Sequence, residues 1–147
     1  MFLGLTDQRF EEVPVGELAE RLLEVGHPDL VITHDDTDLN GDHRRVAEAA
    51  LVAWRPSVGA PSVLAAEIPG STTWSGRPFA PAYYVDISAT LPAKLSALAC
   101  YGTELREPPH PRSPEGVRAT ATYHGLQSGC PAAEAFRVVR AMAGRLP

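Results

Sequence analysis

The residues best suited to chemistry are gathered in one ten-residue stretch, His34 to His43, which reads H-D-D-T-D-L-N-G-D-H. The stretch contains two imidazoles, four carboxylates and one carboxamide. Imidazoles and carboxylates bind cations or exchange protons, and a carboxamide contributes a donor and an acceptor of hydrogen bonds. This density of polar groups predicts a metal site, a proton-transfer site or a polar turn.

The flanking sequence predicts where this stretch lies in the fold. Residues 29–33, D-L-V-I-T, favour a short strand because they are rich in β-branched side chains and follow Pro28. Downstream, apolar residues recur at helical spacing until Pro56 ends the pattern. Because ligands bind at the carboxyl ends of strands in open α/β sheets, the stretch is predicted to be a ligand-binding loop between a strand and a helix.

The rest of the chain predicts alternating helices and strands, and therefore one α/β domain over residues 1–147 with a mainly parallel sheet. We expect strands at 62–68 and 83–88, a helix at about 15–25, and helices that begin near Thr90, Ser113 and Pro131. The last of these places Ala132, Ala135, Phe136 and Val139 on one apolar face.

The small number of predicted strands indicates an incomplete sheet. Residues 30–32 are apolar on both faces, which is typical of a strand with neighbours on both sides in a parallel sheet. Only about three strands are identifiable, so the sheet is expected to be incomplete at its amino-terminal side and to leave an open edge.

Composition excludes several classes of partner. The 147 residues carry a net charge of −5, which argues against nucleic acid and anionic membranes as partners. The two cysteines lack metal-ligand spacing and do not predict a disulfide framework, so a reducing cytoplasm is expected. Neither a signal peptide nor a membrane span is recognisable.

Three interpretations of the polar stretch are open from the residues alone. It could be a solvated turn in which Asp42 caps the helix. It could bind calcium, since Asp36-x-Asp38-x-Asn40-Gly41-Asp42 matches the start of an EF-hand loop, although Ala47 stands where the bidentate Glu is required. Alternatively, His43 could be a transition-metal ligand with a carboxylate beside it.

Several motifs in order along the chain resemble the second half of PIG-L or LmbE-like deacetylases. They are D-L-V-I-T-H-D-D-T-D-L-N-G-D-H-R-R-V, E-I-P-G-S-T-T-W, Y-V-D-I-S-A-T-L-P-A-K-L-S-A-L-A-C-Y, P-R-S-P-E and A-E-A-F. The resemblance extends from Leu3 to Arg140 and implies a Rossmann-like fold. It also implies a zinc-dependent hydrolase that removes an acetyl group from an N-acetylglucosamine-type sugar conjugate.

The resemblance assigns roles to residues of the polar stretch. His43 corresponds to the third zinc ligand, and Asp42 resembles the adjacent carboxylate that tunes the site. Asn40 stands where many members have the His proposed as the general acid. Since an amide does not titrate near neutrality, His34 is the substitute candidate for that role.

The loop at 69–76 is the candidate substrate contact. Its residues Ser71, Thr72, Thr73 and Trp74 are expected to meet the hydroxyls and a ring face of the sugar, or else to form an ordinary surface turn.

The remaining family ligands have no counterpart in the chain. The A-H-P-D-D-E loop, which brings two zinc ligands and the catalytic Asp, is absent, and His27-Pro28-Asp29 precedes a strand where the family motif follows one. A catalytic zinc normally has three protein ligands, so this chain is expected to be inactive by itself. The alternative is a non-catalytic remnant or subunit that binds a partner, a second copy or a missing amino-terminal segment through its open sheet edge.

Overall fold

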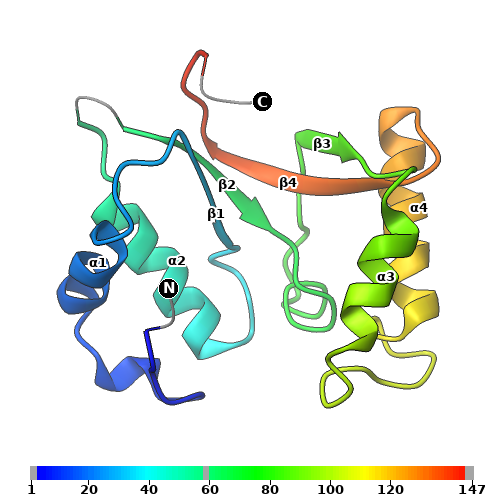
Figure 1. Ribbon diagram of the computed structural model, residues 1–147, viewed down its shortest axis with the longest axis horizontal. Coiled ribbons are helices and arrows are strands. Elements are labelled where there is room, and N and C mark those ends of the chain that lie inside the picture. Colours follow the sequence, from blue (N-terminus) through cyan, green and yellow to red (C-terminus); the bar gives the residue numbers. More distant parts are fainter. Residues whose placement is uncertain (1–2, 58–59, 145–147) are drawn as a thin grey trace. The chain divides into compact units, whose positions relative to one another are not determined.

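A computed structural model describes residues 3–57 and 60–144 (Figure 1). Along this part of the chain the elements are η1 (Phe10–Glu12), α1 (Val15–Leu23), β1 (Leu30–His34), α2 (Gly41–Ala53), β2 (Ser62–Ala66), β3 (Tyr83–Asp86), α3 (Leu91–Ala99), α4 (Pro114–Ser128) and β4 (Ala133–Arg140). The three predicted strands and the first four of the five predicted helices are confirmed, with ends shifted by a few residues.

The fold is α/β, with a four-stranded sheet in the order β1-β2-β4-β3 and flanking helices. Strand β1 pairs with β2 in parallel, whereas β3 pairs with β4 antiparallel. The sheet is therefore mixed, and the expectation of a mainly parallel sheet is corrected. The chain packs as two compact units: the first comprises residues 3–79 and 137–144 of the described chain, and the second residues 80–136.

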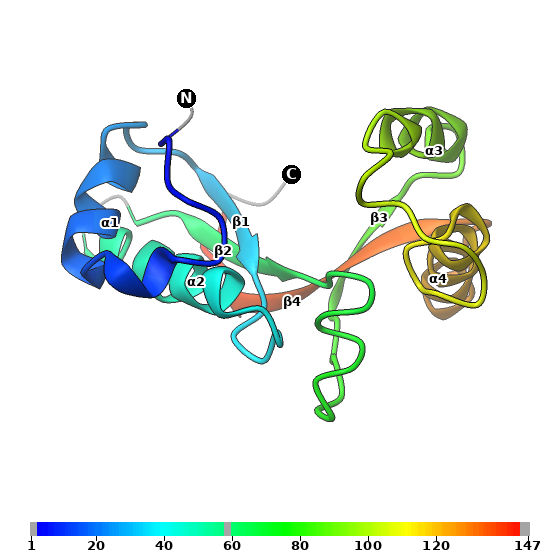
Figure 2. The ribbon, with the colours of Figure 1, turned by 90° about the horizontal axis from the view of Figure 1, so that it is seen from below.

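The core of the first unit lies between its helices and one face of β1 and β2. Val31 and Val63 are aligned across the parallel pair and contact Ala50 and Trp54 of the α2 segment. Leu22 of α1 packs against the same cluster. Figure 2 shows α1 and α2 on the same side of β1 and β2. Burial of this apolar surface supplies the main stabilising term of the unit. It also fixes the direction in which the β1–α2 loop leaves the sheet.

Strand β1 forms an edge with an exposed apolar face. Among the described residues it pairs with β2 alone, so β1 lies at an edge of the sheet, as expected from the small number of predicted strands. Ile32 points to the face opposite Val31 and is 55% exposed, while its register partner Leu64 is 1% exposed. Edge strands of this kind present unpaired backbone groups to other chains.

The second unit packs α4 against α3 and against β3. Its cluster joins Ile87 and Leu91 to Ala121 and Ala132. The predicted start of α4 is confirmed, since the Ser113 hydroxyl accepts a hydrogen bond from the backbone N–H of Gly116 at 3.0 Å. Helix α3 begins directly after Thr90, but that side chain makes no capping hydrogen bond.

The segment after Pro131 is a strand, and the prediction of a helix there was wrong. The apolar residues at 132, 135, 136 and 139 imitate helical spacing, but residues 133–140 form β4. Phe136 pairs with Tyr83 and Ala133 with Asp86, so β3 supplies hydrogen-bond partners that local sequence cannot reveal. Pairing with a distant strand overrides a weak helical pattern.

Replacement of Gly125 by alanine is expected to destabilise the chain by about 1 to 3 kcal/mol, because an added methyl group overpacks a close contact. A Cβ at Gly125 would lie 2.5 Å from the carbonyl oxygen of Cys130 and 2.8 Å from the backbone nitrogen of Ala132. Gly16 of α1 is the matched control, since its Cβ would meet nothing within 4 Å. Gly16→Ala should leave the helix unchanged or stabilise it by roughly 0.5 to 1 kcal/mol in urea unfolding. Equal effects of the two substitutions would contradict the close packing at Gly125.

None of the helices in the described ranges has both the length and the apolar character needed to cross a membrane.

Candidate functional site

The polar stretch forms the loop between β1 and α2, as predicted. Its backbone is folded by its own side chains: Asp35 Oδ1 accepts from the N–H of Thr37 at 2.9 Å, and Asp38 Oδ1 from the N–H of Asn40 at 2.8 Å. The Asn40 side-chain oxygen then caps α2 by accepting from the N–H of Asp42 at 2.8 Å. Asx turns and an N-cap explain why these residue types occur at these positions. The interpretation of the stretch as a solvated turn placed the cap at Asp42, and the structure assigns the cap to Asn40.

His34 and His43 lie together at the start and the end of this loop. Their rings are stacked, with centroids 4.0 Å apart and an angle of 2° between the planes. Burial, and then the neighbouring imidazole of His43, lower the pKa of His34 below its ordinary value. A lowered pKa disfavours the protonated form that a general acid requires. The geometry brings His34 to the candidate site, and its role as an acid stays a prediction.

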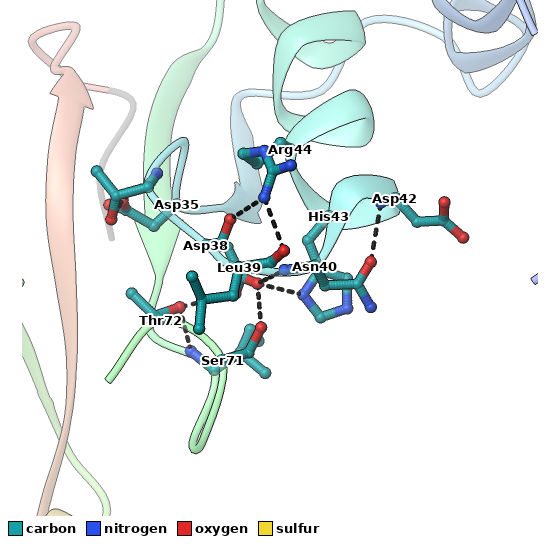
Figure 3. Close-up of polar contacts among 11 residues, drawn as sticks. Asp35, Asp38, Leu39, Asn40, Asp42, His43, Arg44, Ser71 and Thr72 are labelled. Carbon is teal, nitrogen blue, oxygen red and sulfur yellow. Dashed lines mark hydrogen bonds and ion pairs between the residues drawn. The ribbon is translucent and has the colours of Figure 1, made fainter. Parts of the chain in front are cut away.

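Asp38 is the polar centre of the site (Figure 3). Its side chain is buried, and Oδ2 accepts a hydrogen bond from the Thr72 hydroxyl at 2.8 Å, while Oδ1 accepts from the Ser71 hydroxyl. Burial by itself raises the pKa of Asp38, but the hydrogen bonds from Ser71, from the Asn40 N–H and from Thr72 outweigh it and hold the pKa below its usual value. The carboxylate therefore joins the β1–α2 loop to the loop after β2 as a stable anion.

The imidazole of His43 faces this carboxylate. Its Nδ1 is buried and lies 3.2 Å from Oδ1 of Asp38, which is the distance of an ion pair without the angle of a hydrogen bond. An acidic group beside one ring nitrogen is the usual way of orienting a histidine that binds through the other nitrogen.

Asp42 points away from His43 (Figure 3). One of its carboxylate oxygens accepts from the backbone N–H of Gln8 at 2.7 Å and the other from that of Phe10 at 3.1 Å. Asp42 thus ties the amino-terminal segment to α2. Its tuning role stays a prediction, and the carboxylate that contacts the His43 ring is that of Asp38.

The four residues predicted to contact substrate divide into structural and exposed ones. Thr72 is 0% exposed, and its hydroxyl accepts from the N–H of Ile68 while donating to Asp38. The Ser71 hydroxyl is also used by Asp38. Thr73 is exposed and lies 3.3 Å from a Glu67 carboxylate oxygen, and Trp74 is 54% exposed. Of these four residues, Thr73 and Trp74 are therefore the exposed ones.

A second buried carboxylate, that of Asp35, anchors the loop to β4. Its Oδ2 accepts from Nε of Arg137 at 2.7 Å, and Oδ1 accepts from the Thr37 hydroxyl at 2.6 Å. Burial by itself raises the pKa of Asp35, but the hydrogen bonds from Thr37 and Arg137 outweigh it and hold the pKa below its usual value. Arg137 also contacts the exposed carboxylate of Asp36. The guanidinium therefore holds two neighbouring loop residues to one strand.

Neither a calcium site nor a complete zinc site is formed by the described side chains. The three carboxylates that matched an EF-hand each bind a different partner. Asp36 contacts Arg137, and Asp38 accepts from Ser71 and Thr72. Asp42 accepts from backbone N–H groups. Within residues 3–57 and 60–144, no group of three or more His, Cys, Asp or Glu side chains is arranged to hold a metal ion. His43 is a single potential ligand, so these residues do not by themselves fit a catalytic zinc.

Sequence reasoning did not single out Asp38 or Arg137. Asp38 was counted among the acidic residues of the stretch, but its contacts with the 71–72 loop depend on how the two strand ends meet. Arg137 lies 102 residues from Asp35, and the segment containing it was predicted to be helical. The hydroxyl-rich loop S-T-T after β2 is the one sequence signal that indicates donors for a buried carboxylate.

No family model and no curated protein matches the chain. A solved structure does resemble it: the conserved protein TT1542 from Thermus thermophilus matches with a TM-score of 0.68 and 25% sequence identity. The match covers 97% of this chain and 67% of that chain. This similarity supports the α/β fold, and part of TT1542 lies outside the matched region.

Proposed function

We propose that this chain carries one part of the active site of a PIG-L or LmbE-like sugar deacetylase, with His43 as its contribution to a zinc site. The observation that supports this most strongly is the His43 ring, which faces the buried carboxylate of Asp38 at 3.2 Å and lies at the carboxyl edge of a parallel strand pair. In open α/β sheets this edge is where ligands bind.

The proposed substrate is an N-acetylated sugar conjugate. Trp74 is exposed on the loop that Asp38 holds in place, and an exposed indole suits one face of a sugar ring. Thr73 adjoins it and offers a hydroxyl, while Thr72 shapes the loop from inside. In this proposal the chain positions the sugar, and side chains from outside residues 3–57 and 60–144 complete the metal site.

The proposed location is the cytoplasm. Cys100 and Cys130 are both free thiols, which is compatible with a reducing compartment.

A second candidate function is that of a non-catalytic subunit that binds a partner through β1. The observation that favours it is the edge position of β1, with Ile32 exposed on its uncovered face. An extended segment of a partner could add to this edge through backbone hydrogen bonds.

The purified chain is expected to release no acetate from N-acetylglucosamine derivatives with or without added zinc, because it brings one of the three usual ligands. Co-expression with the amino-terminal segment of a relative that carries A-H-P-D-D-E should give a complex that contains zinc and releases acetate. Zinc content by mass spectrometry and acetate release by a coupled assay are the measurements.

His43→Ala should abolish zinc binding and activity in that complex, whereas His27→Ala is the matched control, since His27 precedes β1 and is not a proposed ligand. Activity of the pure chain that is lost in His43→Ala would refute the expected inactivity. Zinc retained at full occupancy in the His43→Ala complex would refute the proposed function.

A further inference from the structure

Asp38 places a fixed negative charge beside one nitrogen of His43. Asp38 is 1% exposed, and its side-chain oxygens accept hydrogen bonds from the Asn40 N–H and from the hydroxyls of Ser71 and Thr72. These donors come from two loops, so the carboxylate cannot rotate away without breaking several bonds at once. Its position relative to His43 is therefore set by the packing of both loops.

A neutral imidazole has two tautomers, which differ in the nitrogen that carries the proton. With the proton on Nδ1, the positive end of an N–H bond faces Asp38 Oδ1 at 3.2 Å. With the proton on Nε2, the lone pair of Nδ1 would face the negative carboxylate at the same distance, which is electrostatically unfavourable. The difference is large in a buried site because screening there is weak. The sign of this preference does not depend on an ideal hydrogen-bond angle.

We propose that Asp38 is a positioning residue that keeps the proton of neutral His43 on Nδ1 and so presents the Nε2 lone pair to a ligand. The use of Nε2 to bind zinc depends on the proposed function, but the tautomer does not. Neither neighbouring candidate performs this task. Both oxygens of Asp42 accept from backbone N–H groups of residues 8 and 10, and His34 contacts the face of the His43 ring, where no nitrogen lone pair points.

Long-range ¹H–¹⁵N correlation spectra of the ¹⁵N-labelled full chain, recorded without metal at a pH where His43 is neutral, test the proposal. The expected wild-type pattern has a protonated Nδ1 and an unprotonated Nε2 on His43. In Asp38→Ala the dominant form should change to, or mix with, the tautomer protonated at Nε2. A wild-type spectrum with the proton on Nε2 would overturn the proposal without any variant.

Thr72→Val is the matched control because it removes a donor to Asp38 and leaves the carboxylate in place. It should lower stability but keep the Nδ1-protonated tautomer. If Asp38→Ala keeps the wild-type tautomer, or if Thr72→Val changes it as much as Asp38→Ala does, the role of Asp38 is only structural and the proposal fails. If Asp38→Ala does not fold, the wild-type and Thr72→Val spectra decide the matter. Since no metal is present, this result is independent of whether the completed complex deacetylates a sugar.

Discussion

Ile32→Lys is expected to convert a self-associating or poorly soluble chain into a monomer. Ile32 is the exposed apolar residue in the middle of β1, which pairs with β2 alone among the described residues. A strand edge with an apolar side chain recruits further strands, and a lysine at such an edge is a common natural protection against this. The apparent association constant should fall by roughly tenfold or more, equivalent to at least about 1.4 kcal/mol. Multi-angle light scattering over a range of concentrations measures the change.

Val25→Lys is the control for this prediction, because Val25 is also an exposed apolar residue but lies between α1 and β1, outside both elements. It should leave the association unchanged. A wild-type chain that is a stable, cooperatively folding monomer at high concentration would contradict the prediction and weaken the second candidate function. Equal loss of association in both variants would show that general hydrophobicity, and not the edge of β1, drives it.

Asp35→Asn is expected to lower the free energy of unfolding at pH 7 by about 2 to 4 kcal/mol, since it removes the charge from a largely buried ion pair. Asp35 is 2% exposed and accepts from Thr37 and Arg137. Arg137 retains its contact with Asp36 and is partly exposed, which places the expected loss toward the lower part of this range. Urea unfolding followed by circular dichroism measures the difference.

The effect should depend on pH in a defined direction. The pKa of Asp35 is lowered in the folded state, so its stabilisation is present above the unfolded-state pKa of about 3.9 and is lost as the pH falls through the lower folded-state pKa. Asparagine does not titrate, so the gap between wild type and Asp35→Asn should close in acid.

Asp36→Asn is the matched control for this titration. The Asp36 side chain contacts the same guanidinium but is 68% exposed, and its loss should cost at most about 1 kcal/mol. A gap between wild type and Asp35→Asn that stays constant from pH 7 to pH 2 would contradict the assigned role of the Asp35 charge.

The sequence by itself determined the elements whose signals are local. The β-branched run ending at His34, the cap and proline at Ser113–Pro114, and the apolar spacing before Pro56 each correspond to an observed strand or helix. These signals are reliable because β-branched side chains, helix caps and prolines, which lack a backbone N–H, influence the conformation of residues only a few positions away. The position of His34 and His43 at the two ends of one loop follows from the same local information.

Tertiary structure decided what depends on pairing between distant residues. Residues 133–140 became a strand because Tyr83–Asp86 supplies its hydrogen bonds, although their apolar spacing is helical. Similarly, among the acidic residues of one stretch, Asp38 faces His43 while Asp42 binds the backbone of residues 8 and 10. A carboxylate accepts from whichever donors the packing of strands and helices brings near it, and sequence spacing does not specify those donors.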